Sequence, residues 1–188
     1  NSFSSLAIAG IGSAMRLDQF ICMPCSTLGL AMTTFIGQNL GAGKIERTHQ
    51  SVKTAMISTV IYVIALGIPL YFISPWLIRI FSEDPEVIMY GTGFLHVILP
   101  VYILMGMNML FAGIIRGYGY SITAMICVLI GYIGVRQIWL YITLNFVAHD
   151  VKYLYWCYPA GWAAAAIPLV LVYLFIIRRK FPSEKKTA

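Results

Sequence analysis

The chain alternates long apolar runs with short breaks that are polar or rich in glycine. A membrane-spanning helix needs about 20 mostly apolar residues, whereas a strand of a transmembrane barrel needs about 10 residues of alternating polarity. The apolar runs of this chain are longer than such strands and do not alternate. We therefore predict an all-α integral membrane protein with five transmembrane helices, at approximately 4–36, 52–78, 87–115, 121–147 and 154–177.

The breaks between the runs contain residues that stop and start helices. Gly41 and Gly43 are placed to end the first helix, because glycine accepts the left-handed conformation that follows many helices. Before the third run, Ser82 or Asp84 is a candidate N-cap, and Pro85 fits the first turn of the helix that follows. These residues predict tight connections rather than long linkers.

Composition excludes a soluble domain. Hydrophobic residues make up 60% of the 188 residues and charged residues only 11%, whereas soluble domains have about 45–50% apolar and about 25% charged residues. So few charges cannot coat a soluble globule.

The distribution of the charges predicts an orientation. With five helices, loops 37–50 and 116–120 share one side with the C-terminal tail 178–188. That side carries nine basic residues: Lys44, Arg47, Lys53, Arg116, Arg178, Arg179, Lys180, Lys185 and Lys186. The other side carries two, Arg79 and Lys152. Cytoplasmic loops are enriched in Lys and Arg, so we expect a multi-pass protein of the plasma (inner) membrane with a cytoplasmic C-terminus. The net charge of +6 then needs no nucleic-acid partner.

The stretch GQNLGAGKIER, residues 37–47, interrupts this apolar pattern with glycines, amides and basic side chains. A phosphate-binding P-loop requires a glycine five residues before the second glycine, and a Ser or Thr after the lysine. Here those positions hold Gln38 and Ile45, so the spacing and the hydroxyl both fail. We interpret the stretch as a helix end followed by a tight turn.

Other patterns give weak signals for chemistry. Cys22 and Cys25 form a CxxC spacing inside a span, where we expect thiols that face lipid or the core rather than a redox centre. His96 lies in the outer part of the third span and either titrates or packs between helices. The absence of a nucleophile–base pair and of metal-ligand spacing argues against an enzyme, a cofactor and a bound metal.

Two small-x-x-x-small spacings occur at span ends. They are Gly37 with Gly41 and Gly113 with Gly117. Such spacings permit close helix approach, but at the end of a span they equally well form turns. The sequence does not choose between the two.

Three charged residues fall inside the predicted spans: Arg16, Asp18 and Arg136. A charge at the bilayer centre costs about 2.5–3.5 kcal/mol on insertion scales, so such residues are usually functional or paired. Arg16 and Asp18 are two apart and should not pair with each other. Asp18 and Arg136 are compatible with a structural ion pair that fixes helix packing. Arg16, Asp18 and Arg136 are also compatible with a cavity-lining cluster that contacts substrate or cation, and coincidence is the third alternative.

Residues 27–55, TLGLAMTTFIGQNLGAGKIERTHQSVKTA, resemble the multidrug and toxic compound extrusion (MATE) family of secondary transporters. Members carry a similar glycine–glutamine–asparagine signature between two helices, which here corresponds to Gly37, Gln38, Asn39, Gly41, Gly43 and Arg47. Further segments resemble the family in the same order: MRLDQF at 15–20, IIRGYG at 114–119, GVRQIWLY at 134–141 and YPAGW at 158–162.

This resemblance implies an architecture and a function. Family members consist of two six-helix lobes, so the five spans are expected to be helices eight to twelve, most of one lobe of a twelve-helix transporter. The start at Asn1, without a signal peptide, agrees with a fragment whose partner is a missing N-terminal lobe. The implied function, as part of a longer chain, is Na⁺- or H⁺-coupled antiport of organic cations and drugs by alternating access. The alternatives are a lipid-linked saccharide flippase of related architecture and a membrane scaffold without transport activity.

The expected position of the coupling carboxylate is open. Some MATE members carry it on the tenth helix, but residues 94–115 of this chain contain no Asp or Glu. The resemblance therefore leaves Asp18 or a carboxylate of the missing lobe, and ranks the missing lobe higher. The other expected partners are a small organic substrate and the lipid bilayer.

Overall fold

The computed structural model describes residues 5–147 and 151–182, and it is helical wherever it contains regular structure in these ranges. Within them, five helical segments are long and apolar enough to cross a membrane. Their bounds are Ser5–Gly41, Ile45–Arg79, Pro85–Gly117, Ser121–Asn145 and Val151–Lys180. The prediction of an all-α protein with five long apolar helices is confirmed. The basic residues Lys185 and Lys186 and the loop residue Asp150 lie outside the described residues.

Two segments are single helices and three are composite. The single helices are α1 (Ser5–Gly41) and α2 (Ile45–Arg79). The third segment comprises α3 (Pro85–Ile98), the 3₁₀ turn η1 (Leu99–Val101) and α4 (Tyr102–Gly117). The fourth comprises α5 (Ser121–Leu129), η2 (Ile130–Val135), α6 (Arg136–Ile142) and η3 (Thr143–Val147). The fifth comprises α7 (Val151–Tyr155), α8 (Cys157–Leu171), η4 (Val172–Ile177) and α9 (Arg178–Lys180). The elements η2, η3 and η4 are π-helical.

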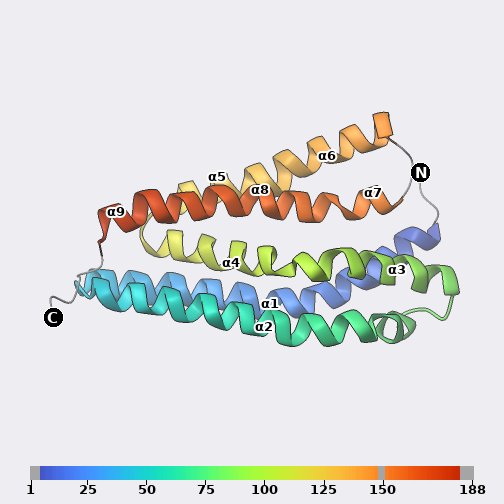
Figure 1. Ribbon diagram of the computed structural model, residues 1–188, viewed down its shortest axis with the longest axis horizontal. Coiled ribbons are helices and arrows are strands. Elements are labelled where there is room, and N and C mark those ends of the chain that lie inside the picture. The colour runs from blue at the N-terminus through green and yellow to red at the C-terminus, as the bar shows by residue number, and fades with distance from the viewer. Residues whose placement is uncertain (1–4, 148–150, 183–188) are drawn as a thin grey trace.

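The third segment forms the centre of the bundle. Figure 1 shows α3 and α4 between two pairs of helices, α1 with α2 on one side and α5–α6 with α8 on the other, and α4 contacts members of both pairs. Its most apolar window is 67% buried, against 11–33% for the other four segments. The segments that surround it expose much more of their apolar surface, as expected of helices that face lipid.

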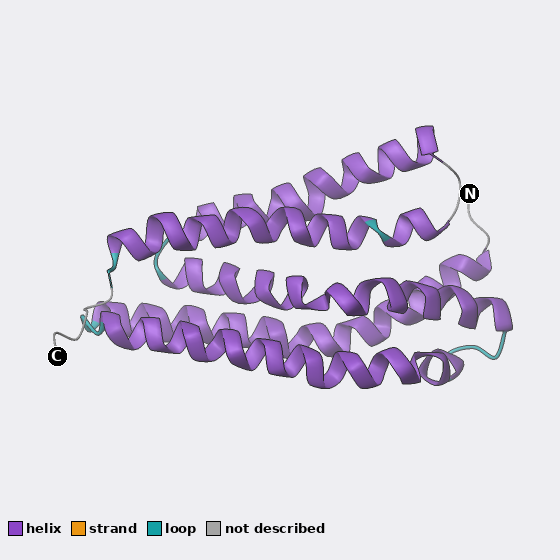
Figure 2. Ribbon diagram, in the orientation of Figure 1, coloured by secondary structure: helices purple, strands orange, loops and turns teal. Residues whose placement is uncertain are grey.

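The connections that the structure describes are short, as Figure 2 shows. At the end of α1, Gly43 adopts a φ of 71°, the Gly43 N–H donates to the Leu40 carbonyl (3.0 Å), and the Lys44 N–H donates to the Asn39 carbonyl (2.8 Å). This Schellman arrangement recurs after α4, where Gly119 has a φ of 91°. The two turns and α9 lie at the same end of the bundle (Figure 1), which we call the basic end.

At the opposite end, α3 begins at the predicted place. Of the two candidate caps, Asp84 is the N-cap: its carboxylate accepts a hydrogen bond from the Glu86 N–H at 2.9 Å. Pro85 occupies the first helical position, where its missing N–H leaves no intrahelical bond unmade. Ser82 supports the cap from outside, because its hydroxyl accepts from the Asp84 N–H at 3.2 Å.

Close helix crossings occur at glycine pairs. A Cβ built on Gly113 of α4 would lie 2.0 Å from the Gly29 carbonyl oxygen of α1, so the two backbones touch. Gly117 is also tightly packed, since a Cβ there would lie 2.8 Å from Cβ of Ile36. At Gly37 the nearest atom would be 3.8 Å away. Of the two small-x-x-x-small spacings, the one on α4 therefore mediates helix packing, and the one on α1 does not.

Candidate functional site

Asp18 lies inside α1 and points toward α4. Its carboxylate accepts a hydrogen bond from the hydroxyl of Tyr102, a fully buried side chain at the start of α4. Cys22, one turn further along α1, adds a thiol whose sulfur lies 3.6 Å from Asp18 Oδ2 and 3.4 Å from the Tyr102 oxygen. The Cys22 sulfur also lies 3.7 Å from the Met105 sulfur. The carboxylate is thus held by two neutral groups.

Arg136 lies on the other side of the central segment, at the start of α6. Its guanidinium carbon is 4.1 Å from the centroid of the Tyr158 ring on α8, which is a cation–π contact. The Tyr158 ring lies 6.3 Å from that of Trp162, and the Trp162 ring lies 5.5 Å from that of Tyr102. Asp18 and Arg136 therefore occupy opposite ends of an aromatic row rather than forming a direct ion pair.

Arg16 is separate from this row. It is exposed, and its guanidinium carbon lies 5.8 Å from the ring centroid of Phe81, just beyond the end of α2. Arg16 and Asp18 point in different directions, because residues two apart on a helix do not face each other.

The residues of the signature stretch occupy the end of α1 and the first turn of α2. Asn39 is buried and its amide nitrogen donates to the Phe35 carbonyl at 2.8 Å, while the guanidinium carbon of Arg47 lies 5.5 Å from the Phe35 ring centroid. The remaining members are exposed: Gly37, Gln38, Gly41 and Gly43. The stretch does form a helix end and a tight turn, as interpreted from its spacing.

Sequence reasoning missed the residues that surround Asp18. Tyr102 sits inside an apolar run, and nothing in its local pattern distinguishes it from a lipid-facing tyrosine. Cys22 packs against the core as expected, and from there its thiol also contacts the Asp18 carboxylate. The spacing of four between Asp18 and Cys22 was visible in the sequence and places both on one face of α1.

The two other chemical signals have structural explanations. His96 connects α3 to α2: its Nε2 lies 3.1 Å from the Ser74 hydroxyl, and its ring stacks on Tyr71 at 4.2 Å. All four cysteines are free thiols. Within residues 5–147 and 151–182, no group of three or more His, Cys, Asp or Glu side chains is arranged to hold a metal ion.

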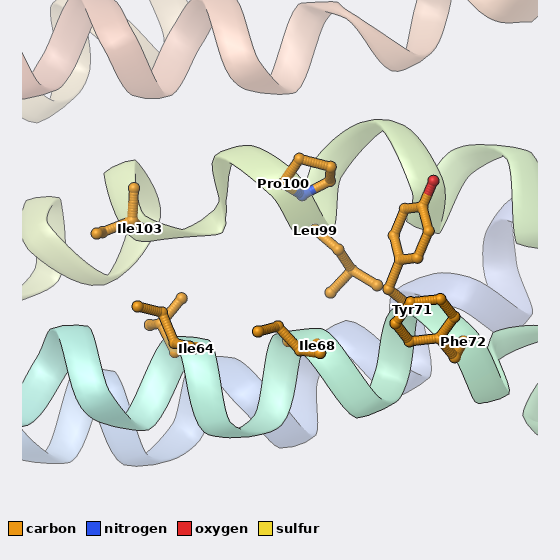
Figure 3. Close-up of a pocket in the computed structure, with 9 residues that line it drawn as sticks. Ile64, Ile68, Tyr71, Phe72, Leu99, Pro100 and Ile103 are labelled. Carbon is orange, nitrogen blue, oxygen red and sulfur yellow. The ribbon is translucent and has the colours of Figure 1, made fainter.

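A separate apolar cavity of about 420 Å³ opens between α2 and η1 (Figure 3). It is lined by Val63, Ile64, Gly67, Ile68, Tyr71, Phe72, Leu99, Pro100 and Ile103. None of these side chains is charged, so the cavity offers a cation aromatic rings but no counter-charge.

The fold agrees with comparisons to known proteins. The MatE family profile matches residues 1–142. The chain belongs to the MATE family. Among its relatives are the probable multidrug resistance protein YpnP of Bacillus subtilis, 26% identical over 132 residues, and a FAD transporter of Shewanella oneidensis, 28% identical over 120 residues. The aligned regions cover 70% and 64% of this chain, but only 30% and 26% of those relatives.

Solved MATE structures show the same fold. An inward-facing MATE transporter superposes with a TM-score of 0.82 at 20% identity, over 91% of this chain and 38% of its own. An outward-facing one gives the same TM-score and identity, over 95% of this chain and 41% of its own. This MATE chain thus corresponds to a part of a longer transporter fold.

Proposed function

We propose that this chain is most of one lobe of a cation-coupled efflux transporter, driven by Na⁺ or H⁺, that exports organic cations and drugs. Membership in the MATE family and relatives described as multidrug resistance proteins support the substrate class. The remainder of the same polypeptide supplies the other lobe, and the substrate binds between the two.

The observation that carries this proposal is the environment of Asp18. It is a carboxylate within a membrane-spanning helix, and its hydrogen-bond partners, Tyr102 and Cys22, are neutral. A carboxylate paired with a basic side chain is already compensated, whereas this one is free to take a proton, a Na⁺ ion or a cationic substrate. These surroundings favour Asp18 over a carboxylate elsewhere in the chain as a coupling residue.

Alternating access follows from the two-lobe architecture. In such transporters, one bundle rocks against the other around a fixed site. The equal similarity of this chain to an inward-facing and an outward-facing structure supports a lobe that moves as one body. The dense crossing of α1 and α4 at Gly29 and Gly113 also favours rigidity, because touching backbones resist sliding.

The membrane orientation is part of the same proposal. Two turns and α9 share the basic end of the bundle (Figure 1), which agrees with the side assigned nine basic residues from the sequence. By the preference of Lys and Arg for cytoplasmic loops, the basic end is cytoplasmic.

The test uses the full-length protein in proteoliposomes. Drug efflux is measured with the sodium and proton gradients collapsed separately, and we expect one collapse to stop it. Asp18→Asn should abolish coupled efflux or reduce it at least tenfold. Asp84→Asn is the matched control, because Asp84 is exposed and asparagine caps helices as well as aspartate does.

Three outcomes would contradict the proposal in different places. Efflux that survives both collapses rules out cation coupling. If cation coupling is unchanged in Asp18→Asn, Asp18 is not the coupling residue, and the coupling carboxylate lies in the rest of the polypeptide. If the protein transports FAD or a lipid-linked saccharide but no organic cations, the proposed substrate class is wrong.

A further inference from the structure

The hydroxyl of Tyr102 has two acceptors on one residue of α1. It donates to the carboxylate oxygen Oδ1 of Asp18, and the Asp18 backbone carbonyl lies 3.2 Å from the same hydroxyl oxygen. A tyrosine hydroxyl carries one hydrogen, so it can donate to only one of these acceptors at a time, and its oxygen can also accept. Tyr102 is fully buried, so the two acceptors on Asp18 take the place of water.

The thiol of Cys22 has a similar choice. It donates to Asp18 Oδ2, which lies 3.6 Å from the sulfur, and the Met105 sulfur is a second acceptor at 3.7 Å. Both carboxylate oxygens thus receive a hydrogen from a neutral donor, and each donor has another acceptor within reach. We call Asp18, Cys22, Tyr102 and Met105 the Asp18 cluster. Its members all belong to α1 and α4, so these contacts are made within this chain.

The Asp18 cluster stays hydrogen-bonded in either protonation state of Asp18. When the carboxylate is ionised, the Tyr102 hydroxyl donates to Oδ1. When Oδ1 takes up a proton, the carboxyl becomes neutral and its new O–H donates to the Tyr102 oxygen, while the Tyr102 hydrogen turns to the Asp18 backbone carbonyl. The Cys22 thiol keeps its bond to Oδ2 in both states. Uptake of a proton therefore leaves none of these buried groups unpaired, which would cost stability.

Sodium matches the Asp18 cluster less well. A hard cation prefers oxygen ligands, whereas thiol and thioether sulfurs suit softer metals. Of the three side chains that accompany Asp18, only Tyr102 offers an oxygen, and its hydrogen is directed at the carboxylate. Cys22 and Met105 offer sulfur. A Na⁺ ion at Oδ1 would have to displace the Tyr102 hydrogen, whereas a proton joins the existing hydrogen bond.

The titratable groups that interact with Asp18 carry no charge at neutral pH. They are Cys22 on α1, Tyr102 on α4, Tyr132 on η2 and Tyr158 on α8, with Tyr62 of α2 next to Cys22. Thiols and phenols ordinarily lose their protons only above about pH 8. On α3, His96 is bonded to Tyr71 and Ser74 of α2 instead. These neighbours therefore neither neutralise the carboxylate nor take its proton.

We propose that Asp18 binds a proton rather than Na⁺, so that H⁺ is the coupling ion, and that Tyr102 is the positioning residue that keeps this proton hydrogen-bonded. The inference rests on the proposed coupling role of Asp18, and it selects one of the two ions that the proposed function allows.

The experiment records infrared difference spectra of the purified full-length protein between alkaline and acid pH, in potassium chloride. A protonated carboxyl has a C=O stretch that an ionised carboxylate lacks. One such band should appear at acid pH in the wild type and be missing from Asp18→Asn, so the difference between the two proteins isolates Asp18. Replacing potassium by sodium at the same pH should leave this band unchanged, because Na⁺ does not displace the proton.

Tyr102→Phe tests the positioning role. Without the hydroxyl, the Asp18 carboxyl loses its acceptor, and its C=O band should move to higher frequency, as in a free carboxyl. Proton-driven efflux should fall about tenfold, the factor that one hydrogen bond is typically worth.

Tyr155→Phe is the matched control for this variant. Tyr155 is also buried and donates to a backbone carbonyl, that of Tyr90 at 3.1 Å, but it does not belong to the Asp18 cluster. Its replacement should leave the Asp18 band at the wild-type frequency.

The inference fails on any of three spectral results. A band that sodium removes at constant pH shows that Na⁺ competes for Asp18. No band at acid pH shows that Asp18 takes up no proton. A band that keeps its frequency in Tyr102→Phe shows that Tyr102 does not position the proton.

The transport assay separates this inference from the proposed function. In proteoliposomes, collapse of the proton gradient should stop efflux; efflux that stops only when the sodium gradient is collapsed overturns the assignment of H⁺. Efflux that survives both collapses contradicts the proposed function itself. The spectra are recorded without substrate or gradient, so they decide between H⁺ and Na⁺ at Asp18 in that case too.

Discussion

The close crossing of α1 and α4 predicts how strongly a methyl group added at Gly113 destabilises the protein. In Gly113→Ala the new Cβ would lie 2.0 Å from the carbonyl oxygen of Gly29 and 2.6 Å from its carbonyl carbon. Ordinary contacts of a Cβ begin at 3.4 Å, so the two helices must separate by about 1.4 Å. The atoms in the way belong to the backbone, and no side-chain rotation can remove them.

The magnitude follows from three contributions. Overpacking a well-packed site costs about 1–3 kcal/mol, and a backbone clash belongs at the upper end of that range. Separation of the helices also weakens the bond from the Thr33 hydroxyl to the Gly113 carbonyl, 2.9 Å long, and such interhelical bonds contribute about 0.6 kcal/mol. Alanine recovers about 0.5–1 kcal/mol through its better helix propensity. We expect a net loss of about 2.5 kcal/mol in the free energy of unfolding.

The measurement is unfolding of the purified full-length protein by SDS titration, with Gly37→Ala as the matched control. The nearest atom to a Cβ on Gly37 is 3.8 Å away, so that variant should be as stable as the wild type or slightly more stable. Equal stability of Gly113→Ala and Gly37→Ala would refute the argument that backbone contact at Gly113 holds the two helices together.

Three further predictions concern topology, the intramembrane charges and pH. Cysteines at Lys44 and Glu83 in a cysteine-free background should label from opposite sides of the membrane; labelling from one side contradicts the five-span arrangement. Asp18→Arg combined with Arg136→Asp should recover neither stability nor efflux relative to the single variants, because the two residues contact different aromatic side chains; recovery would show direct pairing. Burial raises the pKa of Tyr118 above its ordinary value, although the hydrogen bond to Thr48 on α2 lowers it. The folded state therefore holds this proton more tightly than the unfolded state, and stability present at neutral pH is lost as the pH rises through the raised pKa. Tyr118→Phe should cost about 1 kcal/mol at neutral pH and flatten the alkaline decline in Tm; an unchanged alkaline decline contradicts this.

Local features of the chain were predictable because each depends on a few neighbouring residues. Asp84 and Pro85 start α3 through bonds within one turn, and the turn at Gly43 closes α1 through bonds that reach back three and five residues. The resemblance of residues 27–55 to the MATE family was likewise contained in one continuous stretch, and the family profile confirms it.

The candidate site was predictable only in part. Asp18 and Arg136 stood out as charges in apolar runs, since burial of charge in lipid is costly wherever it occurs. Their partners did not stand out: the hydroxyl that binds Asp18 comes from Tyr102, 84 residues away in the sequence. A direct contact between Asp18 and Arg136 was compatible with the sequence, but the position of a residue along a helix says nothing about how the helix is rotated around its axis.

The sequence by itself determined that this protein has five long apolar helices, approximately where each one lies, and which loops carry basic charge. Partitioning into lipid is a sum over consecutive residues, so no tertiary contact is needed to read it. Only the tertiary structure decided that Tyr102 holds Asp18, that Gly113 rather than Gly37 contacts a neighbouring backbone, and that the Tyr102 hydroxyl reaches two acceptors on Asp18. Each of these depends on how two helices are rotated and offset against each other, and that is set by the packing of the whole bundle.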